Sequence, residues 1–231
     1  MKTPFSLYRP KLSSLAVLGA LVLNATTATS ATFISSKVNG DDQFKIYLST
    51  TQPGAAAVQP EGFQYANGLG WPFTFTSTLY LPQSSSGANF HDYWLNIWVR
   101  DEGGGGPDVL GEFTLTAAPG AGSPSYGSIA GCTFDNGSTA IVTNTTLWRV
   151  TKPLPTSAHP AAPAGYPTWL SNYRPPWVPP TLTPTSLGFN GVGPWGPRSG
   201  ISASAQWLTT APGYPTNNLK EAWFSTHIRC P

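Results

Sequence analysis

Two tryptophans and two polar residues alternate along one stretch of the chain and suit the recognition of a sugar. Trp94, Asn96, Trp98 and Arg100 occupy every second position, which places them on one face of a β-strand. Sugars dock their C–H faces on exposed aromatic rings while polar groups bind their hydroxyls. An open face would therefore be a carbohydrate-binding platform. If the proline-rich stretch 153–184 covers that face, both rings are buried packing instead.

Acidic residues at the ends of predicted strands suggest a second kind of site. Asp41 and Asp42 stand in a turn, and Asp101 and Glu102 end the tryptophan-bearing strand. Calcium takes about 6 to 8 oxygen ligands, often from loop carboxylates. The two pairs would form a candidate calcium site if they meet in the fold. The alternative is that Asp favours turns because its side chain bonds the local backbone.

No catalytic constellation stands out in the sequence. The three histidines, His91, His159 and His227, are far apart and form no metal-binding motif. No Gly-x-Ser-x-Gly nucleophile motif is present. The scattered glutamates allow a glycosidase pair, but their separation cannot be read from sequence. We therefore expect a non-catalytic protein, with a glycan-acting enzyme as the less favoured alternative.

Residues 1–30 have the pattern of a secretory signal peptide. A basic head precedes the apolar run Leu15–Leu23, and the small residues Ala28–Ala31 follow. The run is shorter than the roughly 20 residues that cross a bilayer, so we expect no membrane insertion. Loss of the three cations in this segment changes the formal charge of +2 to about −1. The remaining chain has no Lys or Arg cluster, which argues against nucleic-acid or anionic-membrane partners.

The composition of residues 31–231 predicts a single all-β domain. Charged residues make up only 10% of the chain, Gly and Pro number 24 each, and aromatics reach 13%. Apolar alternation recurs in short runs that end at turn residues, and helical periodicity is absent. This pattern predicts an antiparallel, jelly-roll-like β-sandwich. The proline-rich stretch 153–184 is expected to be an extended segment along its surface, since proline removes the donors of a strand ladder.

The strand that carries the two tryptophans is expected to pair with the next strand. Its other set of alternate residues, from Tyr93 to Val99, is apolar and suits a core. The turn Gly103–Asp108 follows, and then a second apolar run, Val109–Thr116. A glycine-rich turn between two strands favours a hairpin.

The only two cysteines, Cys132 and Cys230, predict a disulfide. An even cysteine count in an exported chain favours pairing, because disulfides persist in oxidising compartments. Two cysteines without nearby histidines do not form a zinc site. The bond would close a loop of nearly one hundred residues.

Several short motifs together resemble a family of secreted bacterial β-sandwich exoproteins, many of which carry a PEP-CTERM-type sorting tail. The motifs are Asn39–Phe44, Tyr93–Glu102, Phe134–Gly137, Val142–Trp148 and Ala222–Thr226. The resemblance implies a galactose-binding-like jelly roll and an extracellular or cell-surface role. This chain departs from the family in lacking the sorting tail and in having the cysteine pair and the proline-rich insertion.

These observations predict a secreted surface or matrix protein that binds a polysaccharide or glycoconjugate. A self-assembling filament or matrix subunit is the alternative, because free strand edges could pair between copies. The first predicted strand, Thr32–Lys37, would then be a candidate for exchange between subunits.

Overall fold

The computed structural model describes residues 31–50, 64–69, 73–81, 92–101, 106–118, 131–152, 177–193, 195–213 and 221–230. Every regular element in these ranges is a β-strand. The twelve strands are β1 (Ala31–Gly40), β2 (Gln43–Ser49), β3 (Gln64–Leu69), β4 (Phe75–Tyr80), β5 (Asp92–Arg100), β6 (Val109–Ala118), β7 (Thr133–Phe134), β8 (Ala140–Val142), β9 (Arg149–Val150), β10 (Thr185–Phe189), β11 (Gln206–Thr209) and β12 (Glu221–Arg229).

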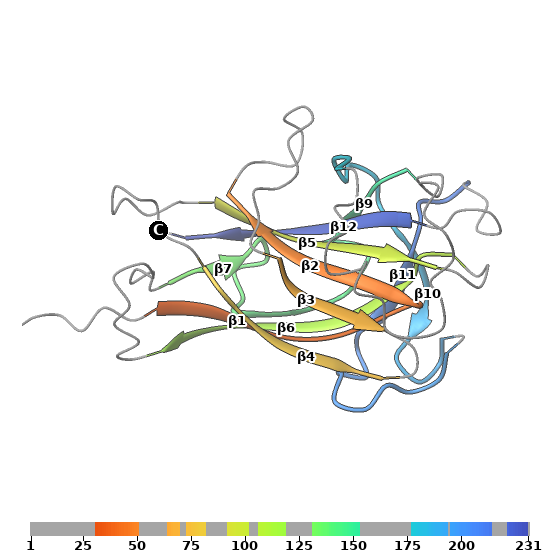
Figure 1. Cartoon of the computed structure of the whole chain (residues 1–231), viewed down its shortest axis with the longest axis horizontal. Coiled ribbons are helices and arrows are strands. Elements are labelled where there is room, and N and C mark those ends of the chain that lie inside the picture. The colour runs from red at the N-terminus through yellow and green to blue at the C-terminus, as the bar shows by residue number, and fades with distance from the viewer. Residues whose placement is uncertain are drawn as a thin grey trace, which may run out of the picture.

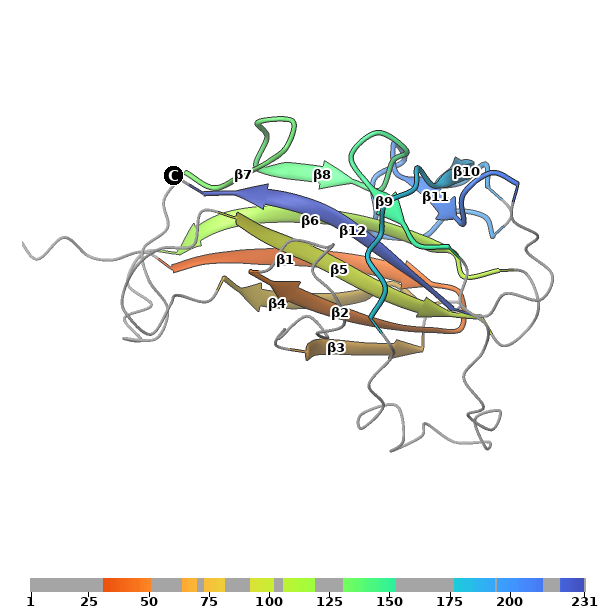
Figure 2. The same ribbon diagram turned by 90° about the horizontal axis from the view of Figure 1, so that it is seen from above.

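The strands form two antiparallel sheets. One sheet has the order β10-β11-β6-β1-β4, with β8 beside β6, and the other has the order β3-β2-β5-β12-β7, with β9 beside β12. Figure 1 shows the second sheet above the first, and Figure 2 looks through both layers. Consecutive strands β4, β5 and β6 alternate between the sheets. The predicted antiparallel, jelly-roll-like sandwich is confirmed.

The main core lies between the two sheets, and β5 contributes to it as its alternation predicts. Tyr93, Leu95, Ile97 and Val99 are completely buried there. They pack with large side chains from both sheets, which include Phe44, Phe113, Trp148 and Phe224. The opposite alternate set of β5 therefore lies on the outer face of the second sheet.

The predicted hairpin between β5 and β6 is wrong. β5 pairs with β2 and β12, whereas β6 pairs with β1, β8 and β11 in the other sheet. The connection after Asp101 therefore crosses from one sheet to the other. Alternation and a glycine-rich turn specify two strands and a reversal, but they do not specify whether the strands pair or face each other across the core.

The connection between β1 and β2 makes the same kind of crossing at the same end of the sandwich. Asp41 and Asp42 form the bend, and Asp42 adopts a φ of 59°. The backbone N–H of Asp41 donates to the carbonyl of Asp108, 2.9 Å away, in the other crossing segment. This bond holds the two crossings side by side.

The predicted disulfide between Cys132 and Cys230 is confirmed. The two cysteines are 98 residues apart and flank the paired strands β7 and β12, in which Phe134 lies opposite Ile228. Closing a loop of this length stabilises the fold by about 4 to 5 kcal/mol on the chain-entropy model. The bond also agrees with an oxidising compartment.

Several sequence predictions lie outside the described residues. These are the signal peptide at 1–30, Glu102, and residues 153–176 of the proline-rich stretch. In the part of the chain that is described, no helix has the length and apolarity to cross a membrane. The strand that was a candidate for exchange, β1, lies inside its sheet between β4 and β6.

Candidate functional site

Three of the four candidate residues on β5 do not form an open platform, and for Trp98 the alternative of buried packing holds. Asn96 and Trp98 have no exposed surface, and Arg100 is 3% exposed. The Trp98 ring packs with Tyr47 and Trp223 in a second buried cluster on the outer face of the sheet. A sugar therefore has no access to Trp98.

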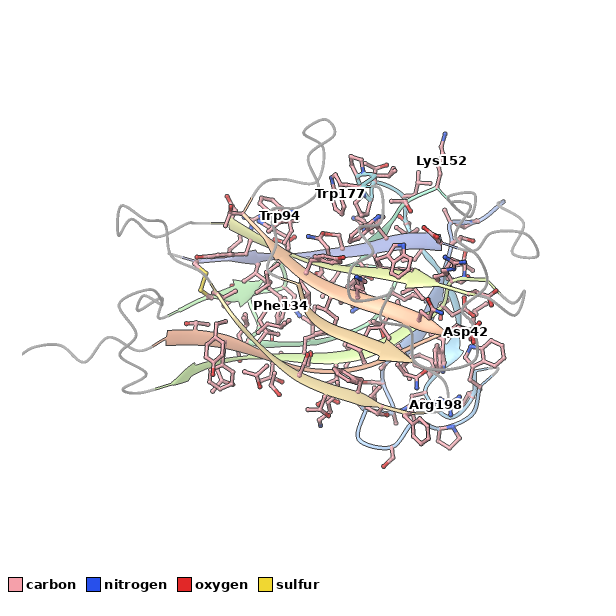
Figure 3. All side chains as sticks on the ribbon, viewed as in Figure 1. Asp42, Trp94, Phe134, Lys152, Trp177 and Arg198 are labelled. Atoms are coloured by element: carbon pink, nitrogen blue, oxygen red, sulfur yellow. A yellow bond between two sulfur atoms is a disulfide. The ribbon has the colours of Figure 1, made fainter. Side chains whose placement is uncertain are left out.

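The cover over this part of the sheet comes from the end of the proline-rich stretch. The rings of Trp177 and Trp223 are 4.8 Å apart in an edge-to-face arrangement. Figure 3 shows Trp177 on the outer side of β12. The pleat of a strand decides which face a residue occupies, but it cannot reveal what a distant segment places on that face.

Arg100 takes part in a buried ion pair. Its guanidinium lies 3.6 Å from a carboxylate oxygen of Glu221, its neighbour across the sheet, and both side chains are almost completely buried. The other oxygen of Glu221 accepts a hydrogen bond from the Trp98 indole at 3.3 Å. Asn96 likewise donates to the Ser49 hydroxyl at 3.0 Å.

Trp94 has a different environment at the other end of the same strand. Its side chain is only half-buried, and its ring stacks on His227 with centroids 4.7 Å apart and planes inclined by 26°. His227 lies directly opposite Trp94 on β12. The two rings together form an aromatic ridge that reaches the surface.

Two carboxylates hold the His227 ring in place. Its Nδ1 is 2.8 Å from Asp135 and its Nε2 is 2.7 Å from Asp92. These two contacts join β5, β12 and the segment after β7, and they fix the orientation of the imidazole beside the Trp94 ring.

A groove of about 450 Å³ runs along the outer face of β12 beside this ridge. The disulfide ties Cys132, just before β7, to Cys230 at the end of β12, and Asp135, just after β7, lies in one wall of the groove. The opposite end of the groove is formed by the segment before β9. The lining side chains are Trp94, Asp135, Thr146, Leu147, Arg149, Pro180, Ser225, Thr226, His227 and Arg229.

Polar groups in the groove differ in how many of their hydrogen bonds are already made within the protein. The Nε of Arg229 donates to Asp135 at 2.9 Å. The Nη1 of Arg149 donates to the carbonyls of Thr146 and Trp148 at 3.0 and 2.9 Å. The buried hydroxyl of Ser225 has no hydrogen-bond partner among the described residues. These groups can orient a polar ligand that rests against the aromatic ridge.

Sequence reasoning missed most of this groove. One alternate set of β12, Ser225, His227 and Arg229, carries the groove floor. That alternation is visible in the sequence. The approach of Asp135 and Arg149 is not, because it depends on the pairing of β7 and β9 with β12.

Three of the four predicted calcium ligands come together at the opposite end of the sandwich. Carboxylate oxygens of Asp41, Asp42 and Asp101 lie within 4.8 Å of one another. Oxygens that share a calcium ion at about 2.4 Å lie no more than about 5 Å apart. The two sheet crossings bring these residues together, and Figure 3 shows Asp42 at the far end from Trp94.

Burial and mutual repulsion make this acidic cluster unfavourable without a compensating charge. Burial, with the neighbouring charges of Asp42 and Asp101, raises the pKa of Asp41 to about 7. Arg198 is the cation that opposes this shift. Burial lowers the pKa of Arg198 itself, and its guanidinium lies 5.8 Å from the centre of the Trp207 ring.

Asp108 adds a further buried carboxylate close to the cluster. It has no exposed surface, and burial raises its pKa well above its usual range, with smaller contributions from Asp41 and Asp101. Thr209 and Trp195 favour its ionised form. Within the described ranges, however, neither carboxylate oxygen of Asp108 makes a hydrogen bond of normal geometry.

Comparison with known proteins adds no relative to these observations. No family model, no curated protein and no solved structure matches the chain. The resemblance to secreted bacterial exoproteins stays a prediction.

Proposed function

We propose that this protein is a secreted, non-catalytic glycan-binding protein that uses the groove beside Trp94 and His227. The observation that carries the proposal is the half-buried Trp94 ring at the edge of a groove lined by hydroxyl, carboxylate and guanidinium groups. Sugar recognition needs this combination of an aromatic surface and oriented polar groups. The disulfide and the predicted signal peptide support an extracellular or surface location.

The engagement of the acidic groups supports a non-catalytic role. Glycoside hydrolysis requires one carboxylic acid to protonate the leaving oxygen and a second carboxylate to act as base or nucleophile. Beside the groove, Asp92 and Asp135 each lie within hydrogen-bond distance of a His227 ring nitrogen, and Asp135 also accepts a hydrogen bond from Arg229. Both carboxylates are therefore engaged by side chains of the protein itself.

Retention on immobilised polysaccharides tests the proposal. We expect wild-type protein to be retained by at least one of a panel of neutral and acidic polysaccharides, and Trp94→Ala to lose most of that retention. Phe189→Ala is the matched control, because Phe189 is a half-exposed aromatic on the other sheet. Retention that is unchanged in Trp94→Ala would exclude this groove. Release of reducing sugars would identify an enzyme, and polymers in light scattering without retention would favour assembly.

We also propose a calcium site at the acidic cluster of Asp41, Asp42 and Asp101. The supporting observation is that their carboxylate oxygens approach within 4.8 Å although Asp41 and Asp101 are buried. A divalent cation would offset this repulsion, and the nearby Asp108 carboxylate adds to the negative potential. Such an ion would join the two sheet crossings and stabilise that end of the sandwich.

The pH dependence of stability gives this second proposal a definite sign. The folded pKa of Asp41, about 7, exceeds its ordinary value of 3.8, so the folded state holds the proton more tightly than the unfolded state. Without a metal, the free energy of unfolding therefore falls as pH rises from about 4 to about 7. In chelator we expect the melting temperature to drop by a few degrees between pH 5 and pH 8. Calcium should restore it at pH 8 and have little effect at pH 5.

Variants separate calcium binding from a general salt effect. Asp42→Asn removes one ligand charge, and asparagine tolerates the positive φ of this position. It should abolish the calcium response at pH 8. Asp135→Asn, a carboxylate at the opposite end of the sandwich, should retain it. An equal calcium response in both variants would contradict the site.

A further inference from the structure

We infer that the groove beside Trp94 takes an anionic polysaccharide, whose carboxylate or sulfate groups are bound by Arg149 and Arg229. The inference rests on the proposed glycan-binding function and adds the chemical class of the ligand. Its basis is that two guanidinium groups line one groove while each retains unused donors.

Arg229 presents most of its guanidinium to solvent. Its side chain is 69% exposed, and only its Nε is engaged, by Asp135 at 2.9 Å. Its two Nη groups have no hydrogen-bond partner among the described residues. The bond to Asp135 limits the motion of the guanidinium, and the free edge is the one that binds carboxylate or sulfate oxygens in pairs.

Arg149 is oriented from the opposite side of the groove. Its Nη1 is bound to two backbone carbonyls, those of Thr146 and Trp148. Within the described ranges, its Nε and Nη2 make no hydrogen bond. These carbonyl contacts hold the guanidinium without neutralising its charge, since the acceptors are neutral. A preorganised cation of this kind loses little side-chain entropy when an anion binds.

The acidic residues of the groove do not cancel this preference. Asp135 is already shared between His227 and Arg229, and Asp92 contacts the other ring nitrogen of His227. Arg149 has no carboxylate partner among the described residues. The charge left for a ligand is therefore positive at Arg149 and at the outer edge of Arg229.

A buried hydroxyl adds a second indication that the groove holds a polar ligand. Ser225 is 3% exposed and lines the groove, and its Oγ has no partner in the described part of the chain. A buried hydroxyl without a partner costs free energy unless a ligand or water supplies one. A sugar hydroxyl beside the bound anion would do so.

Dextran, carboxymethyl-dextran and dextran sulfate provide a matched set of probes, because they share one backbone and differ in charge. In affinity electrophoresis we expect wild-type protein to bind at least one charged polymer at least tenfold more tightly than dextran. The charged polymer that binds better identifies carboxylate or sulfate as the recognised group. Binding should weaken with added salt, as expected for exposed charges.

Charge-removing variants assign the effect to the two arginines. Arg149→Gln and Arg229→Gln should each weaken binding of the charged polymer roughly tenfold, the effect of losing one charge-assisted hydrogen bond. Lys152→Gln removes the same charge from an exposed residue outside the groove and should leave binding unchanged. Figure 3 shows Lys152 away from Trp94.

The outcomes distinguish this inference from the proposed function. Equal binding of dextran and its charged forms, or equal weakening by all three charge variants, would overturn the anionic preference. Retention on a neutral polysaccharide that depends on Trp94 would then leave glycan binding standing. If no polysaccharide of any class is retained, both conclusions fall.

Discussion

Trp94 and Trp98 stand on the same face of β5, yet one borders a groove and the other has no exposed surface. Their neighbours across the sheet explain the difference. Trp98 lies between Lys45 and Trp223, whereas Trp94 lies between Ser49 and His227. The Trp98 end has bulky neighbours and receives Trp177 as a cover.

The two ends of this sheet are also stabilised differently. The Trp98 end is closed by aromatic packing and by the buried pair of Arg100 and Glu221. The Trp94 end has a polar groove and is tied by the disulfide between Cys132 and Cys230. The Trp94 end leaves its aromatic ring only half-buried and so buries less apolar area, and the disulfide adds stability at that end.

Removing the disulfide should produce the largest effect. The double variant Cys132→Ala/Cys230→Ala is expected to lose about 4 to 5 kcal/mol of unfolding free energy, because the loop of 98 residues is no longer closed in the unfolded chain. Urea unfolding measures this loss. Since Cys132 positions the wall that contains Asp135, polysaccharide retention should also fall in the folded variant. Unchanged stability would show that the Trp94 end does not depend on this link.

Truncation of the two tryptophans should separate stability from binding. Trp98→Ala is expected to lose about 3 to 5 kcal/mol, as buried aromatic side chains do when they are removed. Trp94→Ala should lose less, about 1 kcal/mol, because its ring is only half-buried. Thermal unfolding followed by circular dichroism compares them. Equal losses in the two variants would contradict the difference between the two ends.

Breaking the buried ion pair of Arg100 and Glu221 tests the stability of the Trp98 end further. Glu221→Gln should cost about 3 kcal/mol, because it leaves the Arg100 guanidinium buried without its countercharge. The double variant Arg100→Met/Glu221→Met replaces both charges with apolar chains and should recover most of this loss. A double variant as unstable as Glu221→Gln would show that the penalty does not come from an isolated charge.

Fluorescence quenching should show the smallest effect. Acrylamide reaches exposed indoles, so Trp94→Phe should remove part of the quenchable emission. Trp98→Phe should remove only emission that acrylamide does not reach. The same quenchable fraction in both variants would mean that the two rings are equally accessible.

Part of the fold could be read from local pattern alone. The alternation of apolar residues from Tyr93 to Val99 identified their burial, because the pleat of a strand sends alternate side chains to opposite faces. The cysteine count identified the disulfide. The same signals could not exclude a hairpin between β5 and β6, since a turn reverses the chain both in a hairpin and in a crossing from one sheet to the other.

In the candidate sites, too, local pattern identified single residues but not which of them meet in the fold. The acidic turn at Asp41 and the strand end at Asp101 were recognised separately, and two adjacent sheet crossings bring them together. Trp94 and Trp98 were placed on the same face of the strand, but the sequence left open whether that face is exposed or covered. His227 and Asp135 were not assigned to any site, because their contact joins segments 92 residues apart.

The sequence by itself determined the all-β class, the two faces of β5 and the cysteine pair, because alternation and composition act through neighbouring residues. Only the tertiary structure decided that Trp98 is completely buried while Trp94 is half-buried. It also decided that four aspartates gather at one end of the sandwich and that a groove forms at the other end. These outcomes depend on which distant strands pair and in which register, and side chains from Ser49, Trp177 and His227 then close or open the surface.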